Sequence, residues 1–137
     1  MENGDSLNIF PFYMNESSRN EFRIDALVNG VKPENSKSLV SLLSFKPQKN
    51  TDGYQNIGIY INQNSQQIGL IANGVNHGYV YNYPSKLKNI YFSFIALHRD
   101  ISAIDINKEF SIELITDAKK LKNNYPTGTT DICGTKI

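Results

Sequence analysis

Alternating apolar and polar positions dominate the middle of the chain. From Asn56 to Leu97, apolar residues occupy every second position of several short runs, and turn residues separate the runs. A period of two is typical of β-strands whose two faces meet different surroundings. Ile57, Ile59 and Ile61 show this period most clearly, with Gly58, Tyr60 and Asn62 between them. The pattern predicts four consecutive strands, at residues 56–62, 67–72, 76–83 and 90–97.

The residues between these runs predict tight hairpins. Gln63 to Gln66 is the expected loop of the first hairpin. Asn73-Gly74 is the expected turn of the second, because both residues accept a positive φ at little steric cost. Pro84 should end the third strand, since proline has no backbone donor for the ladder. The fourth run is apolar on both faces apart from Ser93, which suits a strand in the middle of a two-layer core.

The first third of the chain predicts three more strands. Leu7 to Tyr13 is apolar and aromatic but contains Pro11, so an edge strand is expected. A regular strand pattern runs from Phe22 to Val28, and Asn29-Gly30 should close it as a hairpin turn. Ser38 to Phe45 fits a strand or a short helix, and its length favours a strand.

The last third has a less regular pattern. Ile101 to Ile106 has no clean period and predicts a loop lying on the core, whereas Glu109 to Thr116 resumes the alternation of a strand. Asp117 to Asn124 predicts a single short helix, with Thr116 or Asp117 capping its start. Asp131 to Cys133 is a candidate for a short final strand. The 137 residues are therefore expected to form a single all-β domain, an antiparallel β-sandwich with one short helix near the C-terminus.

Two stretches resemble known families. The order Gly58-Ile-Tyr-Ile, a short loop, Ile68-Gly-Leu-Ile-Ala-Asn-Gly-Val, Gly78-Tyr-Val and Pro84 resembles the central meander of concanavalin-like jelly rolls of the SPRY and laminin-G type. This resemblance covers about forty residues and implies a jelly-roll form of the sandwich. The ending from Tyr125 to Gly134 is similar to the tail of an uncharacterised family of bacterial exported proteins. This resemblance implies no particular activity.

Composition and charge exclude several classes. With 39% hydrophobic and 20% charged residues, the chain has the composition of a globular protein. A net charge of +1 argues against a nucleic-acid binder, which would carry a basic stripe to neutralise phosphates. No apolar run reaches the roughly 18 residues that span a bilayer, so no membrane insertion is expected.

The single cysteine, Cys133, bears on cofactors and on localisation. No second cysteine or nearby histidine suggests a zinc site, and we expect no metal and no cofactor. One interpretation is that Cys133 lost its disulfide partner with an upstream segment, in which case the native protein is longer and exported. The other is a reduced cytoplasmic thiol. Together with the tail resemblance, the sequence favours a secreted or cell-envelope protein, with the cytoplasm as the alternative.

The sequence offers binding candidates rather than catalytic ones. It contains no nucleophile elbow, phosphate loop or dinucleotide fingerprint, and we expect no enzyme. Tyrosine has a flat apolar face and a polar tip, and asparagine supplies amide donors and acceptors, so both suit the binding of a sugar or a protein. The candidate binding residues are Tyr60, Asn76, His77, Tyr79, Tyr81, Asn82 and Tyr83.

Two interpretations of the three tyrosines in the third strand remain open. Because Tyr79, Tyr81 and Tyr83 alternate, a regular strand would place all three on one face. They belong to the core if that face is also the face of Ile57, and they form an exposed strip that needs a ligand if it is the opposite face.

We therefore expect a non-catalytic binding module for a glycan or an exposed protein surface in the bacterial envelope. The alternative is a structural or assembly protein that self-associates through the aromatic strip or through the edge strand at Leu7 to Tyr13.

Overall fold

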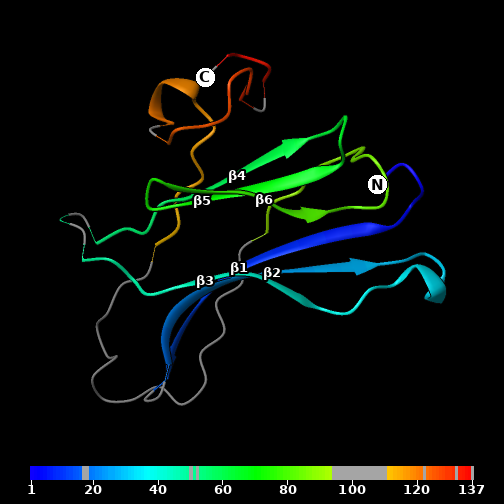
Figure 1. Ribbon diagram of the computed structural model, residues 1–137, viewed down its shortest axis with the longest axis horizontal. Helices are drawn as coiled ribbons and strands as arrows, with labels where there is room; N and C mark the ends of the chain where they lie inside the picture. Colours follow the sequence, from blue (N-terminus) through cyan, green and yellow to red (C-terminus); the bar gives the residue numbers. More distant parts are fainter. Residues whose placement is uncertain are drawn as a thin grey trace.

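The protein folds into two three-stranded antiparallel sheets stacked as two layers (Figure 1). A computed structural model describes residues 1–16, 19–49, 51, 53–93, 111–121, 123–131 and 133–136. In each sheet the strands are neighbours in sequence order, so each sheet is a meander. The all-β antiparallel fold expected from the sequence is confirmed. The more specific jelly-roll assignment stays a prediction.

The first sheet comprises β1 (Ser6–Glu16), β2 (Arg19–Asn29) and β3 (Val40–Phe45), in that order. β1 lies at the edge, as Pro11 predicted. β2 is central, and its alternate residues Ile24, Ala26 and Val28 are each 0% exposed. The connection from β2 to β3 is ten residues long and contains the 3-10 helix η1 (Pro33–Asn35). The two-residue hairpin turn expected at Asn29-Gly30 is therefore wrong.

The second sheet comprises β4 (Ile57–Asn62), β5 (Gln67–Ala72) and β6 (Val75–Asn82). These three strands and both hairpin loops lie where the alternation predicted them. Asn73 and Gly74 have φ angles of 47° and 82°, the left-handed conformation that this turn requires. The register pairs Ile57 with Ala72, Ile59 with Leu70 and Ile61 with Ile68, so these six side chains share one face.

That face and the inner face of the first sheet enclose the core. Its fully buried centre is Ile24 of β2, Ile68 and Leu70 of β5, and Tyr83, which directly follows β6. Partly buried residues from the remaining strands surround it: Leu7, Ile9, Leu42, Leu43, Ile57 and Ile61. Each fully buried aliphatic side chain stabilises the fold by roughly 1.5–3 kcal/mol relative to exposure. The two sheets are therefore held together chiefly by β2 and β5.

Two segments that the sequence predicts as strands do not form strands in the part that is described. Residues 90–93 are not in a sheet, and Ile90, Tyr91 and Phe92 are 46%, 85% and 52% exposed. Residues 111–116 are also outside any strand. A strand-like sequence pattern is not sufficient to form a strand, because the backbone groups also require a neighbouring strand to pair with. Residues 94–97, the expected loop at 101–106 and the start of the run at 109–110 lie outside the described residues.

The short helix expected over Asp117 to Asn124 is also wrong. Among the described residues of this range, only the 3-10 helix η3 (Ala118–Lys120) forms, with the Asp117 carboxylate accepting a hydrogen bond from the Lys119 amide at 2.9 Å. Helices this short are marginal unless an apolar face packs against the core. Where a short strand was expected near Cys133, the described residues show a single bridge, between Thr130 and Lys136. Within the described ranges, no helix has the length and apolar character needed to cross a membrane.

We expect Tyr83 to be a major determinant of stability. Tyr83 is 2% exposed, and its hydroxyl lies 3.1 Å from both the Asn62 carbonyl oxygen and Gln63 Oε1. Tyr83→Ala should lower the free energy of unfolding by about 3–5 kcal/mol, because it leaves a large cavity. Tyr83→Phe should cost about 1 kcal/mol, because it removes only the hydrogen bond. Urea unfolding measures both, and Tyr13→Ala, at a 39% exposed tyrosine, is the control. A Tyr83→Ala cost no larger than the Tyr13→Ala cost would contradict this role.

Candidate functional site

The side of the second sheet that faces away from the first sheet carries three rows of side chains across its strands. We call this side the outer face. The register of β4, β5 and β6 defines an amide row, a tyrosine row and a third row. The amide row is Asn62, Gln67 and Asn82, the tyrosine row is Tyr60, Gly69 and Tyr79, and the third row is Gly58, Ile71 and Asn76.

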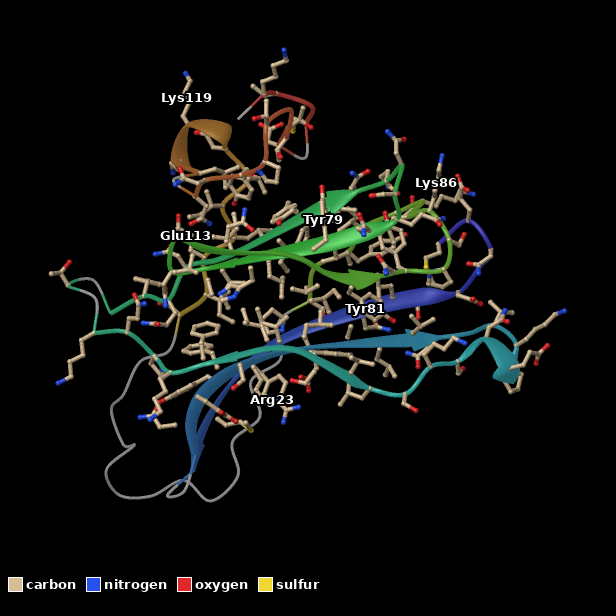
Figure 2. All side chains as sticks on the ribbon, in the orientation of Figure 1. Arg23, Tyr79, Tyr81, Lys86, Glu113 and Lys119 are labelled. Carbon is tan, nitrogen blue, oxygen red and sulfur yellow. The ribbon has the colours of Figure 1, made fainter. Side chains whose placement is uncertain are left out.

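A bulge in β6 decides which tyrosines reach the outer face. Tyr81 pairs with Ile68 and Tyr79 pairs with Gly69, so Val80 is an extra residue with no partner on β5. A single extra residue reverses the alternation of side chains beyond it. Tyr81 therefore packs against the core, whereas Tyr79 points outward and is 45% exposed (Figure 2). The expectation that Tyr79, Tyr81 and Tyr83 share one face is wrong.

Tyr60 anchors the tyrosine row. Its ring lies directly over Gly69, so that a Cβ added to Gly69 would fall 2.0 Å from Tyr60 Cζ. Only glycine leaves room for a ring in this position. Tyr60 is 5% exposed and meets Tyr79 edge to face, with the ring centroids 5.3 Å apart. The buried ring thus supports and orients the exposed one.

The C-terminal segment lies over the second sheet (Figure 1) and contacts the third row. Asn123 and Tyr125 lie against Gly58, and Asn76 Nδ2 donates to the Asn124 carbonyl oxygen at 3.3 Å. Tyr125 also meets Tyr60 edge to face at 6.4 Å. Ile71 is 0% exposed although it belongs to the outer face. The segment closes one end of the outer face and leaves Tyr79 open.

Hydrogen bonds fix the polar groups around the tyrosines. Tyr60 Oη donates to Asn76 Oδ1 at 2.9 Å, and the Gly78 amide donates to the same oxygen at 2.8 Å. Asn62 Nδ2 lies 3.4 Å from Tyr79 Oη. Burial raises the pKa of Tyr60, with Tyr79 adding to the increase and the Asn76 hydrogen bond opposing it. Tyr60 therefore stays a neutral hydrogen-bond donor in ordinary buffers.

The structure brings together only some of the seven predicted site residues. Tyr60, Asn76 and Tyr79 meet on the outer face, and Asn82 joins them through the amide row. His77 is exposed in β6. Tyr81 and Tyr83 belong to the core.

Three residues of the site were not predicted. Asn62, Gln67 and Tyr125 belong to the surface around Tyr79 but carry no motif. For Asn62 and Gln67 the sequence does contain a signal, which is the lack of charged residues around them. From Gly53 to Ser85, 33 consecutive residues contain no Asp, Glu, Lys or Arg, although 20% of the chain is charged. This charge-free stretch contains the whole second sheet.

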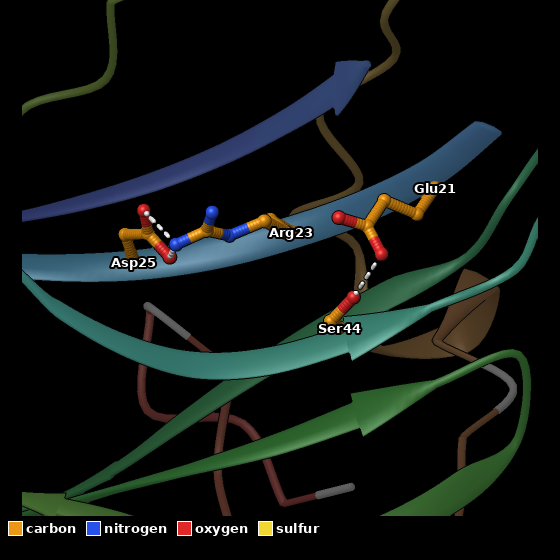
Figure 3. Close-up of polar contacts among 4 residues, drawn as sticks. All are labelled: Glu21, Arg23, Asp25 and Ser44. Atoms are coloured by element: carbon orange, nitrogen blue, oxygen red, sulfur yellow. Dashed lines mark hydrogen bonds and ion pairs between the residues drawn. The ribbon is translucent and has the colours of Figure 1, made fainter. Parts of the chain in front are cut away.

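The opposite surface of the molecule, on the first sheet, has different chemistry. Alternate residues of β2 place Glu21, Arg23 and Asp25 on this side, and Asp25 is buried there at 2% exposed (Figure 3). Arg23 pairs with Asp25 at 3.1 Å and lies over the Phe12 ring, and Ser44 Oγ donates to Glu21 at 2.8 Å. These groups bind one another and tie β2 to its neighbours. In the part of the chain that the structure describes, no group of three or more His, Cys, Asp and Glu side chains is placed to hold a metal ion.

We expect Gly69→Ala to be destabilising through Tyr60. A methyl group at this position must displace the Tyr60 ring, which should cost about 1–3 kcal/mol of unfolding free energy. In a Tyr60→Ala background the obstacle is gone, and the same change should cost nothing or stabilise the strand by up to about 1 kcal/mol. Chemical unfolding of the four proteins in this double-mutant cycle measures the coupling. Equal costs in the two backgrounds would show that the ring contact is unimportant.

Stability should fall in alkaline buffer because of Tyr60 and Tyr83. Burial holds the pKa of both phenols above the usual value of 10.0. Above about pH 10 the unfolded state loses these protons while the folded state keeps them, so rising pH favours unfolding. The free energy of unfolding, measured in urea from pH 8 to pH 11, should decline less steeply in the variant that carries both Tyr60→Phe and Tyr83→Phe. An unchanged slope would assign the decline to other groups.

Comparison with known proteins yields one family. A family model described as "Domain of unknown function (DUF4882)" matches residues 13–135. The searches of curated proteins and of solved structures returned no match. The matched range includes β2 to β6, only the last four residues of β1 (13–16), and the C-terminal residues that cover the outer face. The chain belongs to the DUF4882 family.

Proposed function

We propose that this protein is a non-catalytic binding module for a glycan or an exposed protein surface in the bacterial envelope. The ligand docks on the outer face, around Tyr79. The observation that carries this proposal is an exposed tyrosine in contact with a buried one, since Tyr79 is 45% exposed and Tyr60 beside it is 5% exposed.

Preorganisation makes Tyr79 suitable as a binding platform. Tyr60 supports its ring, and Gly69, Asn76 and Tyr125 hold Tyr60. A rigid aromatic ring loses little conformational freedom when a ligand packs against it, so more of the contact energy appears as affinity.

The amide row supplies the polar part of the site. Asn62, Gln67 and Asn82 lie next to the tyrosine row, about two residues or roughly 6.8 Å along the strands. A sugar has an apolar ring face and a rim of hydroxyl groups. Tyr79 complements the ring face and the amides complement the hydroxyl groups, so among the two kinds of ligand we favour a glycan.

Export is part of the same proposal. It is supported by the likeness of the tail to exported proteins and by the exposure of Cys133, whose thiol is accessible to a disulfide partner.

A second candidate function is self-assembly, and the charge-free stretch favours it. β4 and β6 are the edge strands of the second sheet, and both lie within Gly53 to Ser85. Natural proteins commonly place charged side chains on edge strands, and these charges prevent the strand from pairing with another chain. Edges without charge are open to a second copy of the chain.

Tyr79→Ala should abolish most glycan binding. We expect at least a tenfold loss of affinity, equivalent to about 1.4 kcal/mol, because an anchoring ring is removed. Tyr79→Phe should bind within about threefold of the original protein, since the ring remains. Tyr13→Ala, at a similarly exposed tyrosine of the first sheet, is the matched control. A glycan array identifies the ligand, and calorimetry with that glycan gives the dissociation constants.

Light scattering at two protein concentrations separates the two functions. A monomer that binds a glycan through Tyr79 supports the binding module. A mass that rises with concentration, without glycan binding, supports assembly. A monomer that binds no glycan contradicts the glycan proposal.

A further inference from the structure

We infer that the ligand is an uncharged glycan and that Gln67 and Asn82 of the amide row select it by binding its hydroxyl groups. This inference rests on the proposed function and names the ligand class for the same outer face.

The strands of the outer face offer no charged side chain to a charged ligand. None of the nine positions in its three rows is Asp, Glu, Lys or Arg, and neither is any other residue from Gly53 to Ser85. The side of the first sheet that faces away from the core, by contrast, carries Glu21, Arg23 and the buried Asp25 from one strand. When a carboxylate, sulfate or ammonium group leaves water and meets no opposite charge, it loses far more hydration free energy than neutral hydrogen bonds restore. The outer face is therefore built for a neutral ligand.

The amide row presents an open donor beside an open acceptor. Gln67 Nε2 donates to Asn82 Oδ1 at 3.1 Å, which orients both amides. Within the described part of the chain, Gln67 Oε1 and Asn82 Nδ2 have no hydrogen-bond partner. A hydroxyl group both donates and accepts, so one or two sugar hydroxyls can satisfy this pair. Asn62 is less available, because its Oδ1 accepts from the Asn64 and Ser65 amides and its Nδ2 lies near Tyr79 Oη.

Lys86 provides an internal control for charge. It is exposed and lies at one end of the second sheet, just past the charge-free stretch (Figure 2). An acidic glycan bound near the amide row would use a cation such as this one, whereas a neutral glycan would not.

The test begins with the full chain on a glycan array that contains neutral and charged glycans. We then compare matched pairs: chitohexaose with its deacetylated form, and carboxyl-reduced polygalacturonate with the native polymer. Binding that depends on Tyr79 should be confined to uncharged glycans. Its dissociation constant should change less than about twofold between roughly 50 and 500 mM NaCl, because no ion pair is screened.

Variants then test the assigned residues. Gln67→Ala and Asn82→Ala should each weaken binding of the selected neutral glycan by about 2- to 12-fold, the equivalent of one hydrogen bond. Lys86→Gln should leave the affinity unchanged. Urea unfolding of each variant separates loss of binding from loss of fold.

Two results would count against the inference in different ways. Tyr79-dependent binding of an acidic or basic glycan, weakened by salt or by Lys86→Gln, would overturn the neutral-ligand inference and leave the binding module standing. The absence of any Tyr79-dependent glycan binding would overturn the glycan proposal and this inference together.

Discussion

The contact between Tyr60 and Gly69 is the constraint on which the outer face depends. A ring can lie flat on the neighbouring strand only where that strand has no side chain, and Gly69 provides such a place. With its ring there, Tyr60 fills the space between the second sheet and the C-terminal segment and reaches Asn76, Tyr79 and Tyr125. These contacts join three strands and a distant segment of the chain. Any larger residue at position 69 would force the ring away and release its neighbours.

β5 shows how this contact organises the layers. Its residues from Ile68 to Ala72 are all buried, because one face meets the core and the other lies beneath Tyr60 and the C-terminal segment. An antiparallel strand commonly exposes one face to water. Here the additional cover makes β5 the middle of three layers: the first sheet, the second sheet and the C-terminal segment. The site at Tyr79 lies where that cover stops.

The sequence predicted those features that depend on local chemistry. The alternation of Ile57, Ile59 and Ile61 and the turn at Asn73-Gly74 were sufficient to define the hairpin of β4 and β5 and the turn into β6. It could not predict the bulge at Val80, because an extra residue is visible only when the partner strand is known. That one residue moved Tyr81 to the core and left Tyr79 as the exposed ring. Likewise, the run from Ile90 is apolar on both faces and Ile112 alternates with polar residues, but neither pattern supplies the neighbouring strand that pairing requires. The sequence also could not predict that Tyr125 joins the site, since this depends on contacts across about 65 residues of chain.

The absence of charge from the second sheet is compatible with either binding or assembly, but the two functions use different groups. Pairing at the edges of β4 and β6 uses backbone N–H and C=O groups, and it would be indifferent to what the outer face presents. The outer face nevertheless has a supported, exposed ring at Tyr79 and an oriented amide pair with an open donor and an open acceptor. Edge pairing explains neither feature. A ligand with an apolar ring and hydroxyl groups explains both, and it also explains why no charge lies beside them. For this reason the outer face, rather than the sheet edges, is the surface to which we assign the function.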